Sequence, residues 1–293
     1  MTLTVTSATP AGTGSVTGIG EGFAQLLGLD ALRGVPLAEV DAVAALQHRV
    51  DRKYLITVAS AARLVGELAG SHHVLDIRGR RTTEYRSTYF DTAHLTAWRA
   101  HNQGRRRRWK VRTRLYAEDA ICRMEVKTKD GRGATVKHAH PVEADEYGRL
   151  ETGTEAADFV DRVLGAAGVE VTAADLATAG EVRYRRAALA DLEAGTRLTL
   201  DGLLACHRDG RTAALDDGYV LVETKGTARP VPADRCLLSL GARPLSISKY
   251  AIGISLLVPN LPDNNMRRLA RTRFHTGPRL QTPAARTVRT LPA

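Results

Sequence analysis

Basic and acidic side chains recur at every second position in several segments of the chain. The segment 108–115 has a cation at each even position, namely Arg108, Lys110, Arg112 and Arg114. Because the side chains of a β-strand alternate between its two faces, a strand here would gather these cations on one side. Such a face could bind a chain of phosphates, although a single charged strand face is more often simply exposed to solvent.

The same stripe recurs in four other segments, where carboxylates join the cations. Its members are Arg123, Glu125, Lys127 and Lys129; Glu223 and Lys225; Arg197 and Asp201; and Asp51 and Lys53. If these strands close into a barrel, their charged faces meet in one lumen. Burying so many cations without a polyanion is unfavourable, so the recurrence of the stripe predicts an anionic ligand.

Arginine and lysine together suit a triphosphate or polyphosphate chain. Arginine forks match two phosphate oxygens at once, whereas lysine supplies a point charge. The carboxylates Glu125 and Glu223 would then be ligands of Mn²⁺ or Mg²⁺, hard cations that bridge protein oxygens and phosphates. Asp201 or Asp51 could join them. The alternative is that each carboxylate forms a salt bridge with a neighbouring lysine.

Strand-like alternation of apolar and polar residues dominates the middle of the chain. It predicts eight strands, at 46–56, 83–91, 108–116, 120–129, 134–140, 181–190, 196–202 and 219–226. Apolar residues at helical spacing predict helices at 58–69, 155–166, 233–240 and 248–257. Many strands interrupted by few helices indicate an α+β protein. The expected fold is a closed antiparallel β-barrel with helices packed on its outside.

Composition indicates where the folded unit begins and ends. Small and polar residues dominate the start of the chain, and arginine, proline and threonine dominate its end. We expect a flexible N-terminal segment over 1–34, a folded domain over 35–259 and a basic, disordered tail over 260–293. From residue 261 onward there are seven arginines and one aspartate, so this tail carries much of the net charge of +10.

The chain carries no sequence signal for export, membrane insertion or structural zinc. Its three cysteines, Cys122, Cys206 and Cys236, are widely spaced and form no metal-binding or disulfide pattern. No stretch approaches the roughly 18 apolar residues of a membrane span. A cytoplasmic location and no membrane span are therefore expected.

The charged strands and their neighbours resemble a known family. VDRKYLI, STYFDT, KVRTRLY with MEVKTK, VRYRR, TLDG, LVETKG and PLSISKYAIG follow one another in this chain. The same order is typical of the polyphosphate-polymerase domain of the vacuolar transporter chaperone (VTC) proteins. That domain belongs to the triphosphate tunnel metalloenzymes. The resemblance spans about residues 35–258 and implies a tunnel fold.

The resemblance also implies roles for individual residues. Phosphate contacts would come from Lys53, Arg112, Arg114, Lys127, Arg186 and Arg197. Tyr184 and Ser248 would hydrogen-bond phosphate oxygens, Lys249 would close the far end, and Glu223 would hold the metal. The charged stripes add Lys110, Lys129 and Lys225 as substrate contacts and Glu125 as a second metal ligand. Ser246 stands where a basic residue is expected in the family pattern.

The activity implied by this family is phosphoryl transfer from a nucleoside triphosphate onto a growing polyphosphate chain. We therefore expect a metal-dependent polyphosphate polymerase that works by alignment and charge neutralisation. The same lumen could instead hydrolyse tripolyphosphate or nucleoside triphosphates, with water replacing the acceptor phosphate. Hydrolytic relatives use extra lumen glutamates to orient water, and their scarcity here favours transfer.

A third possibility is a non-catalytic module that binds polyphosphate or another polyanion. Dedicated nucleic-acid binding is not expected, because aromatic residues make up 5% of the chain and no RNA-binding signature is present. The expected ligands are a nucleoside triphosphate and polyphosphate, and the sequence identifies no protein or membrane partner.

Overall fold

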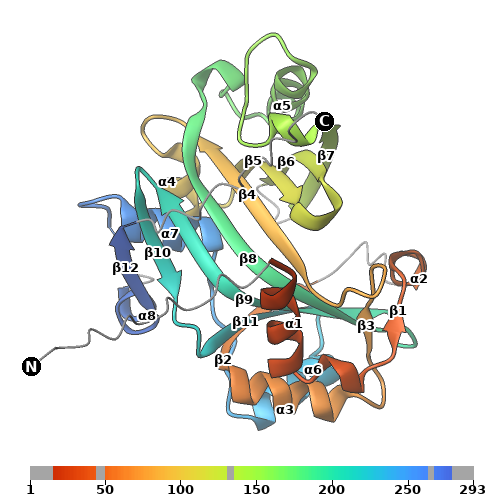
Figure 1. Cartoon of the computed structure of the whole chain (residues 1–293). Helices are drawn as coiled ribbons and strands as arrows, with labels where there is room; N and C mark the ends of the chain where they lie inside the picture. Colours follow the sequence, from red (N-terminus) through yellow and green to blue (C-terminus); the bar gives the residue numbers. More distant parts are fainter. Residues whose placement is uncertain (1–15, 44–49, 131–134, 263–266, 279–293) are drawn as a thin grey trace, which may run out of the picture.

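A single curled sheet is the centre of the molecule (Figure 1). The computed structural model describes residues 16–43, 50–130, 135–262 and 267–278. The strands are β1 (Gly34–Val35), β2 (Val50–Thr57), β3 (His73–Leu75), β4 (Thr83–Asp91), β5 (Arg108–Tyr116), β6 (Ile121–Lys129), β7 (Thr135–Val142), β8 (Ala177–Asp191), β9 (Thr196–Arg208), β10 (Arg211–Leu215), β11 (Tyr219–Gly226) and β12 (Phe274–Pro278).

Strand pairing in the sheet is antiparallel except between β1 and β3, among the residues described. The main path runs β12-β10-β9-β8-β4-β5-β6-β7, and β11 pairs with both β9 and β2. Strands β8 and β9 are the longest. Along its length β9 pairs with β11 and with β10, and it therefore joins the part of the sheet around β2 and β11 to the part around β10 and β12. The predicted α+β fold with a dominant antiparallel sheet is confirmed.

The predicted closure of the barrel is wrong. In the described part of the chain, β2 pairs only with β11, and β7 pairs only with β6. The sheet is therefore strongly curled but not closed by a last pair of strands. The backbone N–H of Leu245 donates a hydrogen bond of 2.8 Å to the carbonyl of Lys53. The irregular segment before α7 thus bonds to β2, where a closed barrel would place another strand.

Helices cover several parts of the sheet (Figure 1). They are α1 (Val16–Leu26), α2 (Leu37–Val43), α3 (Val58–Leu68), α4 (Thr96–Asn102), α5 (Glu155–Ala166), α6 (Pro232–Ser239), α7 (Lys249–Leu257) and α8 (Arg267–Arg273). Helices α1, α3 and α6 share one core with β2, β9 and β11. Helix α5 packs on β5 and β6, and α4 and α7 pack with β8, β9 and β10.

Local sequence explains why the outer helices form where they do. Thr57 and Thr154 precede α3 and α5, and each side chain accepts a hydrogen bond from a backbone N–H of the first turn. Helix α3 buries Ala61, Leu64 and Val65 along one side, at the spacing of an amphipathic helix. All four predicted helices and all eight predicted strands are confirmed, with some ends shifted by a few residues; residues 46–49 and 134 of the predicted strands lie outside the described residues.

Both ends of the chain differ from the sequence-based expectation. Residues 16–34 are not a flexible segment: α1 packs on the sheet, and Leu27 and Leu29 are fully buried. In the expected tail, α8 and β12 are ordered, and β12 pairs with β10. The apolar side of the sheet explains the first difference, because it needs cover that the segment supplies. Residues 1–15 and 279–293 lie outside the described residues.

The helices of the described part of the chain are too short or too polar to cross a membrane.

Candidate functional site

The charged stripes lie on the concave side of the curled sheet, which we call the inner face. Strand register places Lys53 opposite Glu223 and Lys225 opposite Asp51. Burial lowers the pKa of Lys127 on β6, and the negative charges of Asp51 and Glu223 oppose this shift. Strand β6 therefore faces β2 and β11 across the inner face, although these strands are far apart in the sheet order.

Glu125 on β6 is the centre of one cluster on this face. Arg112, directly opposite on β5, donates from Nε to Oε2 at 2.8 Å, and Lys137 donates from Nζ to Oε1 at 2.8 Å. Burial opposes ionisation of Glu125, but the charges of Arg112, Arg114 and Lys137 hold its pKa well below its usual range. Both carboxylate oxygens are thus occupied by cations.

Asp201 on β9 is the centre of a second cluster. Arg186 on β8 forms a two-pronged contact with it, at 2.6 Å from Nε to Oδ1 and 2.7 Å from Nη2 to Oδ2. Lys249, the first residue of α7, places Nζ 2.6 Å from Oδ2. Burial opposes ionisation of Asp201, but the charges of Arg186 and Lys249 lower its pKa. Asp201 therefore neutralises cations from two elements.

Tyrosines of β4 and β8 support the cations of the inner face. The rings of Tyr85 and Tyr184 stack with centroids 5.3 Å apart. The guanidinium carbon of Arg186 lies 4.9 Å from the Tyr85 centroid, and Lys249 Nζ lies 4.7 Å from the Tyr184 centroid. Arg114 donates from Nη2 to the Tyr184 hydroxyl at 3.1 Å. Aromatic faces thus hold the cations in place without neutralising their charge.

Lys110 on β5 reaches α7 at the edge of this face. Its Nζ donates to Ser248 Oγ at 2.9 Å, and Ser248 also accepts the N–H of Ala251 as the N-cap of α7. Burial, together with the nearby charges of Lys127 and Arg112, lowers the pKa of Lys110 to about 7. An anion bound beside Lys110 would stabilise the protonated form of its ammonium group.

A comparison with known protein families shows the family to which this chain belongs. The VTC domain family matches residues 48–258 of this chain, which include every cluster described above. The chain belongs to the VTC family. A search of curated proteins gives no match.

Three solved structures are similar to this VTC chain at low identity. A protein from Hippeastrum, named as an adenylyl cyclase and described as having a dominant triphosphatase activity, is 20% identical with a TM-score of 0.47 over 72% of this chain and 98% of that chain. An adenylate-cyclase-type protein from Bacillus halodurans is 17% identical (TM-score 0.46, 68% and 93%). A Pyrococcus horikoshii protein is 9% identical (TM-score 0.41, 70% and 96%). The family assignment rests on the VTC match alone.

The carboxylates of the VTC domain differ in their fitness for a divalent metal. Glu125 and Asp201 are poor candidates, because their oxygens already bind arginine and lysine. Glu223 and Asp51 lie diagonally on the neighbouring strands β11 and β2 and face the same side. Burial opposes ionisation of Glu223, but Lys225, Lys53 and other inner-face cations hold its pKa well below its usual range. It is therefore a carboxylate at neutral pH.

This pair of carboxylates fits Mg²⁺ or Mn²⁺ that arrives with a phosphate. Such ions are commonly held by one or two carboxylates, with the remaining positions taken by water and substrate oxygens. Among the described residues, no group of three or more His, Cys, Asp or Glu side chains could hold a metal without such help. The structure thus favours Glu223, with Asp51, over the expected ligand Glu125.

Most of the residues expected from the sequence share the inner face. They are Lys53, Lys110, Arg112, Arg114, Glu125, Lys127, Tyr184, Arg186, Glu223, Lys225, Ser248 and Lys249. Lys129 lies farther along β6, opposite Arg108. Arg197 is directed away: its Nη2 donates to the carbonyl of Val40 at 2.7 Å and lies 3.3 Å from Asp41 Oδ1. Helix α2 therefore holds a guanidinium that was expected at phosphate.

Sequence reasoning missed several inner-face residues. Tyr85, Ser87 and Tyr89 contact the arginines of β5: Arg114 Nε donates to Ser87 Oγ at 3.2 Å, and Arg112 Nη1 donates to the Tyr89 hydroxyl at 2.7 Å. Their alternate spacing in TEYRSTYFD was the available signal. Lys137 was missed because the stripe on its strand contains a single lysine.

Proposed function

We propose that the inner face binds phosphate chains, and that the protein is a metal-dependent polyphosphate polymerase. One observation carries the proposal: cations from β2, β5, β6, β8, β11 and α7 point to one concave face, where they outnumber the carboxylates. The surplus leaves positive charge that a polyanion would neutralise. Membership of the VTC family supports the same ligand class.

In this proposal, binding and orientation are the work of the arginines and lysines. Arg112, Arg114 and Arg186 exchange their contacts with Glu125 and Asp201 for phosphate oxygens, while Tyr89 and Tyr184 keep the guanidinium groups in position. Lys110 and Lys249 approach from β5 and the start of α7, so they hold the phosphate chain at one end of the face. A divalent metal on Glu223 and Asp51 would supply further neutralisation of phosphate charge.

The reaction is an exchange of one phosphorus–oxygen bond for another. The bond between the β–γ bridging oxygen and the γ-phosphorus breaks, and the nucleoside diphosphate leaves with the electron pair. A terminal oxygen of the polyphosphate chain forms the new bond to the γ-phosphorus. The protein needs no covalent intermediate, because aligned cations neutralise the three equatorial oxygens as charge develops on them.

The test is to incubate the purified chain with ATP and Mn²⁺ and to separate the products on a gel. Long-chain polyphosphate, formed together with ADP, supports the polymerase. Release of orthophosphate or tripolyphosphate without chain growth contradicts it. Tight binding of polyphosphate with no turnover of any triphosphate would instead favour the non-catalytic binding module.

One observation favours a triphosphatase as the second candidate. Asp51 lies diagonal to Glu223, so the inner face has a second carboxylate beside the proposed metal position. A carboxylate there could orient a water molecule toward the terminal phosphorus. Asp51→Asn distinguishes the two reactions: hydrolysis should fall sharply, whereas transfer to polyphosphate should fall less.

A further inference from the structure

Helix α1 lies outside the matched family region, yet it packs directly behind the inner-face cations. It covers the outer side of β8 and β9, where a bulge places Leu203 and Leu204 of β9 opposite Tyr184 of β8. A bulge of this kind re-aims the side chains next to it. Tyr184 and Arg186, which flank Arg185, point to the inner face.

The contact between α1 and this bulge is unusually close. The Thr82 hydroxyl donates to the carbonyl of Gly20 at 3.2 Å, and a Cβ at Gly20 would lie 2.7 Å from Arg185 Nη1. On β9, a Cβ at Gly202 would lie 2.3 Å from Cε2 of Phe23. Gly202 therefore leaves no room for a side chain, and a side chain at Gly20 would have to displace the guanidinium of Arg185.

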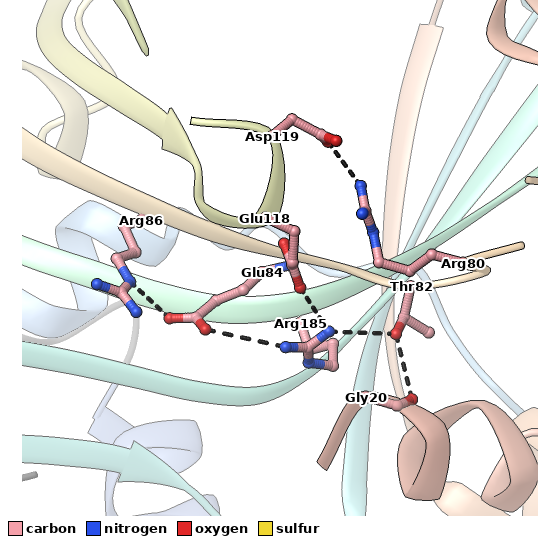
Figure 2. Close-up of polar contacts among 8 residues, drawn as sticks. All are labelled: Gly20, Arg80, Thr82, Glu84, Arg86, Glu118, Asp119 and Arg185. Atoms are coloured by element: carbon pink, nitrogen blue, oxygen red, sulfur yellow. Dashed lines mark hydrogen bonds and ion pairs between the residues drawn. The ribbon is translucent and has the colours of Figure 1, made fainter. Parts of the chain in front are cut away.

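Arg185 connects α1 to the strands that carry the cations (Figure 2). It is 4% exposed, and its Nη1 donates to Glu118 Oε1 at 2.9 Å and to Thr82 Oγ1 at 3.3 Å. Glu118 belongs to the turn between β5 and β6, and it also accepts the backbone N–H of Glu84 on β4. One guanidinium thus joins β4, β8 and the end of β5.

Each member of this outer contact has an inner-face neighbour one residue away. Arg185 precedes Arg186, and Gly202 follows Asp201. Arg185 and Gly202 are register partners, as are Arg186 and Asp201. Because successive residues of a strand face opposite sides, a shift of the outer pair moves the inner pair with it.

We propose that α1 is a positioning element of the phosphate site. Phe23 and Arg185 act as positioning residues: they hold the two strands at the bulge of β9 so that Tyr184, Arg186 and Asp201 keep their places on the inner face. This inference rests on the proposed function, because it assigns α1 a part in phosphate binding. The competing explanation is that α1 only fills the core with Phe23 and its neighbouring leucines.

The experiment compares two variants that lose a large buried side chain from the same core. Phe23→Ala removes the contact with Gly202, whereas Leu237→Ala on α6 removes a fully buried leucine that is not at the bulge. Binding of tripolyphosphate to the full-length chain is measured by calorimetry, well below the unfolding temperature of each variant. Arg185→Gln tests the guanidinium that joins β4, β8 and the end of β5, and Phe23→Leu tests whether an apolar replacement restores binding.

Phe23→Ala and Arg185→Gln should weaken tripolyphosphate binding on the order of tenfold, because misplacement of orienting groups is costly even at a distance. Leu237→Ala should lower stability but leave the dissociation constant for tripolyphosphate unchanged. Phe23→Leu should bring this dissociation constant back to the wild-type value.

Equal weakening by Phe23→Ala and Leu237→Ala, or unchanged binding in Phe23→Ala and Arg185→Gln, overturns the inference alone. A wild-type chain that does not bind tripolyphosphate overturns the proposed function and the inference together, so the wild-type isotherm separates the two failures.

Discussion

Two aspartates, Asp91 and Asp201, are equally buried, with exposures of 1% and 0%, but their partners differ in kind. Within the described part of the chain, the donors to Asp91 are uncharged, namely the backbone N–H groups of Thr92, Ala97 and Trp98 and the hydroxyl of Tyr250. Asp201 accepts from Arg186 and Lys249, which are cations. One carboxylate completes the start of α4, and the other neutralises part of a surplus of charge.

This difference separates a structural carboxylate from a counter-ion at a binding site. Backbone N–H groups have no alternative acceptor when Asp91 is lost, because they are buried at a helix start. Arg186 and Lys249 would have one, since phosphate oxygens match a guanidinium and an ammonium as well as a carboxylate does. A ligand should therefore rescue defects at Asp201 but not defects at Asp91.

The largest expected effect is on turnover. Arg112→Ala and Arg114→Ala should each reduce it by about 100- to 1,000-fold, because each removes charge that acts on developing phosphate charge. Glu223→Ala should act in the same direction through loss of metal affinity. Arg162→Ala on α5, where the guanidinium stacks on Phe159, is the matched control. Steady-state kinetics measure the ratio, and activity retained in all three inner-face variants contradicts the site.

Asp91→Ala should have the next largest effect, on stability. Loss of the acceptor leaves buried N–H groups and the Tyr250 hydroxyl unsatisfied, which should lower the free energy of unfolding by about 3 kcal/mol. Urea denaturation measures this change. Saturating tripolyphosphate should add the same stabilisation to the variant as to the wild type. If it stabilises Asp91→Ala more than the wild type, the distinction between Asp91 and Asp201 is wrong.

Asp201→Asn should show a smaller loss that the ligand reverses. The amide can still accept one hydrogen bond but leaves Arg186 and Lys249 without their counter-charge, so the free energy of unfolding should fall by about 2 kcal/mol. Tripolyphosphate should stabilise this variant more than it stabilises the wild type. Denaturation with and without tripolyphosphate tests this, and equal stabilisation of both proteins would count against the counter-ion role.

The smallest expected effect is a pH dependence from Lys110. Its pKa in the free protein is lowered to about 7, while a bound polyanion would raise it again. Above pH 7, binding of tripolyphosphate should take up a proton, and affinity should fall by up to about tenfold for each unit of pH. Calorimetry in two buffers of different ionisation enthalpy measures the proton, which should disappear in Lys110→Arg.

Stability should change with pH in the opposite direction. The unfolded chain holds the Lys110 proton up to its usual pKa, so between pH 7 and that value the unfolded state binds more protons than the folded state. The contribution of Lys110 to the ligand-free protein therefore becomes more favourable as pH rises through this window. If the affinity for tripolyphosphate and the free energy of unfolding both fall as pH rises through this window, the lowered pKa of Lys110 is contradicted.

Most of the inner face follows from the sequence, because period-two alternation is a local property of strands. Arg112 and Arg114 were placed on one side of β5 by spacing alone, and the structure puts them there. Arg197 shows where this reasoning ends. Its position in β9 follows from alternation, but a long side chain takes its partner from the neighbouring fold, and here α2 provides a carbonyl.

The carboxylates show the same limit. Glu125, Asp201 and Glu223 looked alike as sparse acidic residues among cations, and only the structure assigns arginine and lysine partners to the first two. Expected closure of the barrel failed for a related reason. Whether the last strand meets the first depends on the curl of the whole sheet, which no single segment encodes.

Sequence alone is enough to predict that several strands carry cations on one side and that these strands follow the order of the VTC family. The fold is needed to learn which carboxylates are neutralised, that Lys127 faces Asp51 and Glu223, and that α1 packs behind Arg186. The physical reason is range: alternation depends on neighbours in the chain, whereas charge pairing and packing depend on segments that meet only after the sheet has curled.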